Sequence, residues 1–153
     1  PRVLAGISQL SETYGLRVAN VFHAGDGNMH PLILFDANKP GDLERCEAFG
    51  AAILTLCVEV GGCLTGEHGV GIEKRDLMGV QFTPQDLEEM MQVKDVFDPK
   101  WLLNPAKVFP LEATATRRAS GAAGSIRPGP REYFKRRKTF GRRRENGRFS
   151  CLT

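Results

Sequence analysis

The sequence predicts an α+β domain followed by a basic tail, and three observations support this. Helical and strand-like patterns alternate over residues 1–110 in the order α-β-β-α-β-α. The 153-residue chain is 41% hydrophobic and its 17 glycines follow no three-residue period, which excludes a collagen-like or wholly disordered chain. The charge is divided, because residues 111–153 carry a net charge of +9 and residues 1–110 carry −6.

The first elements predict a helix and two strands. Apolar residues recur at helical spacing over residues 2–15, and Gly15 ends the pattern. Residues 17–24 are rich in β-branched and aromatic side chains, which favour a strand. A Gly-Asp-Gly-Asn turn at 25–28 precedes a second strand at 29–36, since glycine and asparagine tolerate positive φ.

The middle of the domain predicts a long helix and a glycine-rich loop. Apolar residues support a helix over residues 43–60, and the pair Gly61-Gly62 ends it. Residues 63–65 would form a short strand that leads into the loop Gly-Glu-His-Gly-Val-Gly at 66–71.

The last predicted helix begins at Thr83. Threonine is a favoured cap, proline follows it at the first helical position, and an acidic residue lies in the first turn. This helix should run to Val96, and residues 101–110 would form a short closing segment.

Residues 111–153 form a tail rich in Arg, Gly, Ser and Ala, with few aliphatic residues. We expect this tail to be disordered and the folded domain to cover residues 1–110, because the tail buries too little apolar surface to offset its ordering entropy. Its arginine clusters with interspersed aromatics leave a nucleic-acid-binding tail open as an alternative. A solvated tail is the simpler interpretation.

The chain carries no strong signal for secretion or for a membrane span. No apolar run reaches the roughly 18 residues that a span requires, and the N-terminus lacks the features of a signal peptide. None of the four cysteines forms a C-x-x-C pair, so we expect reduced thiols in a cytoplasmic protein. Peripheral attachment at an inner membrane stays open.

The three histidines fall in two short motifs that indicate chemistry. His23 and His30 flank the turn, so a hairpin would place them nearly opposite each other. Glu67 and His68 lie in the glycine-rich loop. Two histidines and one carboxylate with an open position are typical of a catalytic metal site. Histidines with purely structural roles are the alternative, whereas a phosphate loop is disfavoured because the loop lacks the Lys and Ser/Thr of that motif.

Three stretches, at 18–33, 61–78 and 93–110, resemble the C-terminal region of FAD-linked 2-hydroxyacid oxidases. This family includes the flavin subunit of glycolate oxidase and the D-lactate and D-2-hydroxyglutarate dehydrogenases. The resemblance implies a substrate-binding cap with a ferredoxin-like fold, in which an antiparallel sheet has helices on one face.

The resemblance also implies roles for individual residues. His23, His30 and Glu67 match the family's metal ligands, with zinc as the first choice, although manganese, iron or cobalt would also fit. His68 matches the catalytic base. Among the remaining matches, Asn104 and Lys107 belong to an Asn-Pro-Gly-Lys element near the flavin, Ala106 replaces its glycine, and Asp26 and Asn28 should hold the turn.

The implied reaction is the oxidation of a small 2-hydroxyacid to a 2-oxoacid with hydride transfer to FAD. FAD would be bound mainly by an upstream domain, so we expect the chain alone to be inactive. An iron–sulfur subunit and a second FAD-type subunit are implied partners. Two alternatives remain: a D-lactate or D-2-hydroxyglutarate dehydrogenase fragment, or a non-catalytic metal-binding module.

Overall fold

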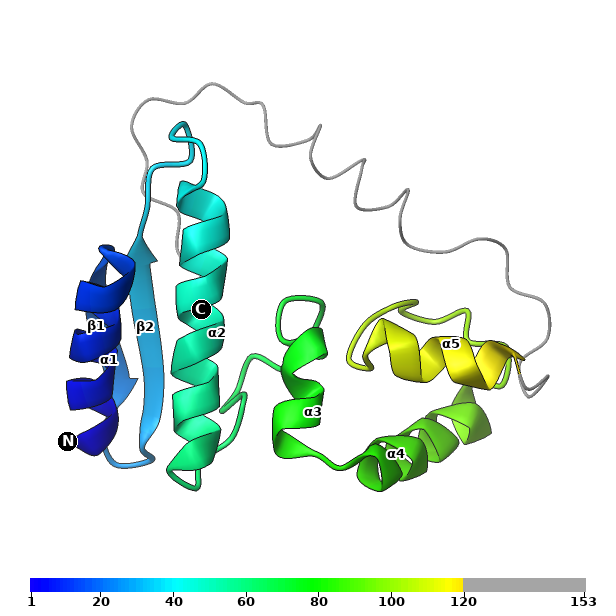
Figure 1. Ribbon diagram of the computed structural model, residues 1–153. Coiled ribbons are helices and arrows are strands. Elements are labelled where there is room, and N and C mark those ends of the chain that lie inside the picture. Colours follow the sequence, from blue (N-terminus) through cyan, green and yellow to red (C-terminus); the bar gives the residue numbers. More distant parts are fainter. Residues whose placement is uncertain (120–153) are drawn as a thin grey trace. The chain divides into compact units, whose positions relative to one another are not determined.

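A computed structural model describes residues 1–119 of the chain (Figure 1). These residues form two compact units, Pro1–Gly69 and a second unit that begins at Val70. The element order confirms the α+β class. It runs α1 (Arg2–Tyr14), β1 (Arg17–His23), β2 (Asn28–Leu34), α2 (Asp42–Glu59), a 3-10 turn at Arg75–Leu77, α3 (Met78–Gln81), α4 (Pro84–Phe97) and α5 (Leu111–Ala119).

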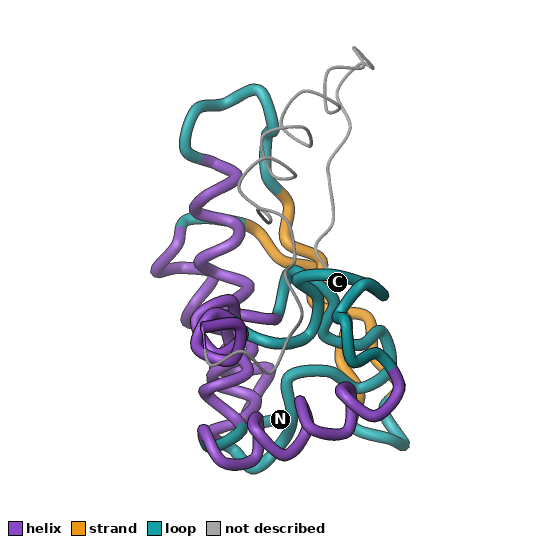
Figure 2. The backbone as a smooth tube through the Cα atoms, turned by 90° about the vertical axis from the view of Figure 1, so that its right-hand side faces the viewer, coloured by secondary structure: helices purple, strands orange, loops and turns teal. Residues whose placement is uncertain are grey.

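The first unit is an antiparallel hairpin with two helices on one face. Strands β1 and β2 (orange in Figure 2) pair so that Val18 lies opposite Ile33 and His23 lies opposite Asn28. Directly paired residues point to the same side of a sheet, so Val18 and Ile33 share a face. That face packs against α1 and α2. The core of the unit formed in this way contains Ile7, Leu16, Ile33, Phe35, Cys46, Phe49 and Ile53. The expected arrangement of sheet and helices is therefore confirmed.

Glycines end both helices of this unit, as the sequence predicts. Gly15 follows α1 with φ 62°. After α2, Gly61 has φ 90° and donates its amide to Val58 O at 2.9 Å, while Gly62 donates to Cys57 O at 2.8 Å. This pair of bonds is a Schellman motif, which satisfies the last carbonyls of the helix.

The second unit is built around α4. Thr83 Oγ1 accepts a hydrogen bond from the Asp86 amide at 3.2 Å, and Asp86 Oδ2 accepts one from the Thr83 amide at 2.8 Å. This capping box confirms the predicted helix start. The core of the unit consists of Met91, Trp101 and Phe109, against which Met90 and Ala113 pack.

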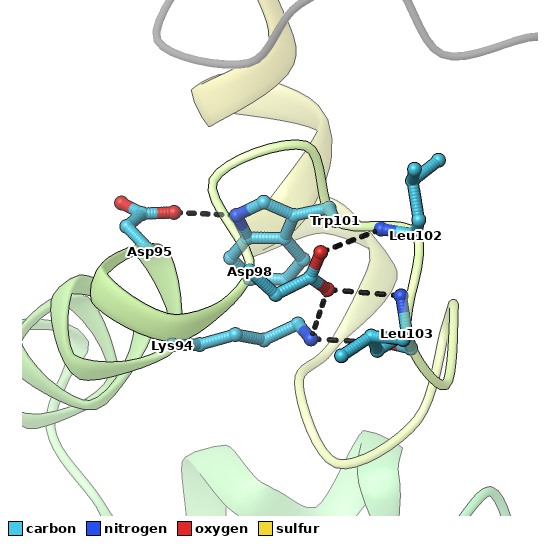
Figure 3. Close-up of polar contacts among 6 residues, drawn as sticks. All are labelled: Lys94, Asp95, Asp98, Trp101, Leu102 and Leu103. Carbon is cyan, nitrogen blue, oxygen red and sulfur yellow. Dashed lines mark hydrogen bonds and ion pairs between the residues drawn. The ribbon is translucent and has the colours of Figure 1, made fainter.

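The carboxylate of Asp98 joins the end of α4 to the segment that follows it (Figure 3). It accepts hydrogen bonds from Lys94 Nζ at 2.8 Å, the Leu102 amide at 2.9 Å and the Leu103 amide at 3.0 Å. The Lys94 contact, with help from the two amides, holds the pKa of Asp98 below its ordinary value, although burial opposes this. Trp101 completes the cluster by donating its indole N–H to Asp95.

The structure differs from the predictions in two segments. Residues 63–65 form a loop, because no neighbouring strand pairs with them; among residues 1–119 the sheet consists of β1 and β2. Residues 111–119 form α5 within the expected disordered tail, where Ala113 packs on the second core and Thr114 is buried. The rest of the tail, and with it the nucleic-acid interpretation, lies outside the described residues.

Two further expectations concern the membrane and the thiols. Within residues 1–119 no helix has the length and apolarity needed to cross a bilayer. In the same part of the chain, Cys46, Cys57 and Cys63 form no disulfide, as expected, and Cys151 lies beyond it.

Candidate metal centre

The hairpin presents His23 and His30 on the face that points away from the core. In the register of the hairpin, His23 pairs with Asn28 and His30 pairs with Val21. The two histidines are therefore diagonal neighbours, because His30 lies two residues beyond the position directly opposite His23. They still share a face with Asn28, and their ring centroids are 5.3 Å apart.

The loop after α2 brings Glu67 and His68 to this face. Leu64 is buried and anchors the start of the loop. Thr65 Oγ1 then accepts a hydrogen bond from the Gly69 amide at 2.9 Å, and Gly69 adopts φ 82°. This small turn closes around Glu67 and His68, so glycine at position 69 serves the conformation that presents them.

One carboxylate oxygen is the centre of the site. Glu67 Oε1 lies 2.8 Å from His30 Nε2 and 3.6 Å from His23 Nε2. The possible ligand atoms of these three residues all lie within 4.8 Å of one another. The structure thus brings together the three residues that the sequence indicates as metal ligands.

His68 lies beside this group. Its Nε2 is 3.8 Å from Glu67 Oε1, and its ring stacks on that of His30 with centroids 5.2 Å apart. Its side chain is 48% exposed, so the imidazole is open to a ligand from outside the unit.

The donor set fits a divalent transition metal. Two imidazole nitrogens and one carboxylate oxygen match the borderline ligands that zinc and its neighbours prefer. His30 is 16% exposed, whereas His23 is 59% and Glu67 47% exposed. The site is therefore anchored at His30 and open on its other side, where a catalytic metal needs free positions.

Asn28 takes a role that the sequence reasoning missed. We expected Asp26 and Asn28 to hold the turn, and the Asp26 amide does donate to His23 O at 3.1 Å. Asn28 instead begins β2, and its Nδ2 donates to Glu67 Oε1 at 3.0 Å. Nothing in the hairpin sequence indicates this contact, since its partner lies beyond α2.

The expected flavin-side residues lie in the second unit. Asn104 and Lys107 are exposed and contact each other, with Lys107 Nζ 3.2 Å from Asn104 Oδ1. Ala106, which stands at the glycine position of the element that the resemblance implies, adopts φ 60°. The position therefore does require positive φ, and alanine is strained there.

Arg75 is a second residue that the sequence reasoning missed. It is buried, and its Nη1 donates to Ala106 O at 2.7 Å. In the same segment, the Val108 amide donates to Gly71 O at 2.8 Å. Arg75 and Gly71 thereby hold the backbone of the segment that carries Asn104 and Lys107. The pairing joins residues distant in the sequence, so no local pattern reveals it.

Comparison with known proteins identifies the family. Residues 1–108 match the model of the FAD linked oxidases, C-terminal domain. The chain belongs to this family. It is 60% identical to the glycolate oxidase subunit GlcD of Escherichia coli K12 over 110 residues, which cover 72% of this chain and 22% of that protein.

Two other relatives carry different names. A D-lactate dehydrogenase of Archaeoglobus fulgidus is 40% identical over 103 residues, covering 66% of this chain and 22% of the relative. A D-2-hydroxyglutarate dehydrogenase of Stutzerimonas stutzeri is 38% identical over 93 residues, which cover 57% of this chain and 19% of the relative. This FAD-linked oxidase domain therefore spans about a fifth of the length of the curated relatives it matches.

Proposed function

We propose that this chain supplies the metal site and the proton acceptor of an FAD-dependent oxidoreductase that oxidises a small 2-hydroxyacid to a 2-oxoacid. The observation that carries the proposal is the convergence of His23 and His30 on Glu67 Oε1 beside His68. Residues 1–110 would form the substrate-binding cap, in agreement with the extent of the family match.

Each residue has a distinct part in this proposal. His23, His30 and Glu67 would hold a divalent cation, zinc by preference, which when bound polarises the oxygens of a 2-hydroxyacid and lowers the pKa of its hydroxyl. His68 would accept the hydroxyl proton at Nε2, since a neutral imidazole is a suitable base near neutral pH. Asn104 and Lys107 would face FAD, which supplies the hydride acceptor.

Glycolate is the favoured substrate. The GlcD subunit shares 60% identity with the chain, against 40% for the D-lactate dehydrogenase, and its name describes it as a subunit. We therefore propose a multi-subunit enzyme, with an iron–sulfur subunit and a second FAD-type subunit as partners. A D-lactate or D-2-hydroxyglutarate dehydrogenase is the alternative, and cytoplasmic location stays a prediction.

A chimera tests the proposal. Residues 1–110 of this chain would replace the matching segment of the Escherichia coli GlcD subunit, and glycolate oxidation and metal content would be measured. We expect an active, metal-containing chimera. His68→Ala should keep the metal and lose at least about 100-fold in turnover, because general-base catalysis contributes on this scale.

The outcomes separate the roles. In the same chimera, His23→Ala and Glu67→Ala should lose both metal and activity. Metal loss in His68→Ala alone would make that residue a ligand and overturn its role as base. A folded chimera that oxidises D-lactate and not glycolate would select the alternative substrate. Full activity after His23→Ala would reject the metal site altogether.

A further inference from the structure

Asn28 lies at the point where the hairpin meets the loop that carries Glu67. It pairs with His23 at the start of β2, so it belongs to the same face as both histidines. Its Nδ2 donates to Glu67 Oε1 at 3.0 Å. This is the oxygen that faces His30 Nε2 at 2.8 Å, so one neutral amide fixes the atom on which the site converges.

Gly66 fits this contact. A Cβ at position 66 would lie 2.8 Å from Asn28 Cγ and closer still to Asn28 Oδ1. The φ of Gly66 lies outside the left-handed region, so its backbone conformation does not itself demand glycine. The missing side chain at position 66 is therefore explained by the close approach of the Asn28 amide.

A half-exposed glutamate loses less rotamer entropy on binding a metal when a neighbouring group already holds its carboxylate. Glu67 is 47% exposed, and a free glutamate side chain loses rotamer entropy when it is fixed as a ligand. A hydrogen bond that already holds Oε1 reduces this loss, and an amide does so without adding a charge that would repel the cation.

We propose that Asn28 is a positioning residue that holds Glu67 in its metal-binding orientation, and that Gly66 provides the space for it. This inference rests on the proposed metal site. The amide acts through Glu67, and it is the carboxylate that would contact the cation.

Zinc binding to the full 153-residue chain tests the inference by titration against a chelating indicator. We expect Asn28→Ala to weaken Zn²⁺ binding about 10–100-fold, the usual effect of losing a residue that orients a ligand. Gly66→Ala should weaken binding similarly, because its methyl group displaces the amide. Gly25→Ala is the matched control, since no atom lies within 4 Å of a Cβ there and its φ is not positive.

The double variant is the decisive measurement. If both substitutions act on one contact, Asn28→Ala with Gly66→Ala should bind Zn²⁺ no more weakly than either single variant. The visible absorption of bound Co²⁺ should change in both single variants and stay as in the wild type in Gly25→Ala, which a purely structural role would not produce. Asn28→Asp should also bind more weakly, because it replaces a donor by a second carboxylate.

Several results would overturn the inference. Unchanged Zn²⁺ affinity in Asn28→Ala would do so, as would additive losses in the double variant. Tighter binding by Asn28→Asp would make residue 28 a direct ligand instead. If circular dichroism shows that Asn28→Ala is unfolded, the Zn²⁺ affinity and the Co²⁺ spectrum of Gly66→Ala test the inference instead, and wild-type values of both would overturn it. A folded wild-type chain that binds no Zn²⁺ rejects the metal site as well, whereas loss in His23→Ala but not in Asn28→Ala rejects only the positioning role.

Discussion

Glu67 in the first unit and Asp98 in the second are both carboxylates surrounded by nitrogen groups, but their surroundings differ. Asp98 is buried, and two backbone amides and Lys94 donate to it at 2.8–3.0 Å. Glu67 is about half exposed, and three of the four nitrogens near its Oε1 belong to imidazoles at 2.8–3.8 Å.

The difference separates a structural carboxylate from a proposed metal ligand. The partners of Asp98 are donors only, so its hydrogen bonds are complete within the chain. An imidazole nitrogen, in contrast, offers a lone pair to a metal when it is not protonated. The groups around Glu67 therefore include atoms that a cation can use, whereas the groups that donate to Asp98, Lys94 and the Leu102 and Leu103 amides, offer a cation no lone pair.

Removing Asp98 should have the largest effect on stability. Asp98→Ala leaves two amides without their acceptor and removes the carboxylate partner of Lys94, which keeps Leu103 O, and we expect the midpoint of thermal unfolding to fall by about 10 °C. Glu67→Ala should shift it by no more than about 2 °C, because Glu67 and two of its three histidine partners are about half exposed or more. Calorimetry of the two variants checks this, and equal shifts would contradict the distinction.

For metal affinity, the substitutions around Glu67 should have the larger effect and the substitution of Asp98 the smaller. His23→Ala and Glu67→Ala each remove a proposed ligand, so we expect Zn²⁺ to bind at least about 100-fold more weakly in the full chain. Asp98→Asn should bind as the wild type does. Isothermal titration calorimetry provides the measurement, and a loss of Zn²⁺ binding in Asp98→Asn would show that the two clusters are coupled.

Acid should destabilise the chain through Asp98. Its pKa is lowered in the folded state, so the folded state binds fewer protons than the unfolded state, and the stabilisation is complete above the unfolded value of 3.8. It is lost as the pH falls through the folded pKa. We expect urea midpoints to drop below about pH 4, and to drop less steeply in Asp98→Asn. If the urea midpoints of the wild type and of Asp98→Asn fall in parallel with pH, Asp98 is excluded as the source of the acid destabilisation.

The smallest expected effect concerns the backbone near Arg75. Ala106 adopts φ 60°, which glycine accepts without strain. Ala106→Gly should therefore raise the free energy of unfolding by about 0.5–1 kcal/mol, the strain relieved being partly offset by the greater freedom of glycine in the unfolded chain. Urea unfolding measures this change. A destabilised variant would mean that the methyl group of Ala106 contributes packing that outweighs its strain.

Local signals in the sequence predict much of the fold. Gly15, the pair Gly61-Gly62 and the Thr83 capping box all act on neighbouring residues, and the helix ends they imply lie within one residue of those observed. Residues 63–65 failed as a strand because a strand requires a partner that local composition cannot supply. Likewise, α5 depends on the packing of Ala113 against a core that includes Trp101.

The sequence indicated which residues would come together, but not the register of the hairpin that carries them. The expected turn placed His23 nearly opposite His30, whereas His23 pairs with Asn28. The pairing is displaced by two residues, an even number, so both histidines keep the same face and the convergence survives. The contacts of Asn28 with Glu67 and of Arg75 with Ala106 could not be foreseen, because they join segments that only the folded chain brings together.

The site lies on the face of the hairpin that the core does not use, and this separates its residues from the packing of the scaffold. Core residues such as Ile33 pack on one face of the hairpin, whereas the side chains at alternate positions point to the other face and do not pack in this core. Substitutions there should therefore cost little stability. The two faces of the hairpin therefore divide packing from the candidate site, so the residues of the site can be exchanged one at a time while the scaffold stays folded.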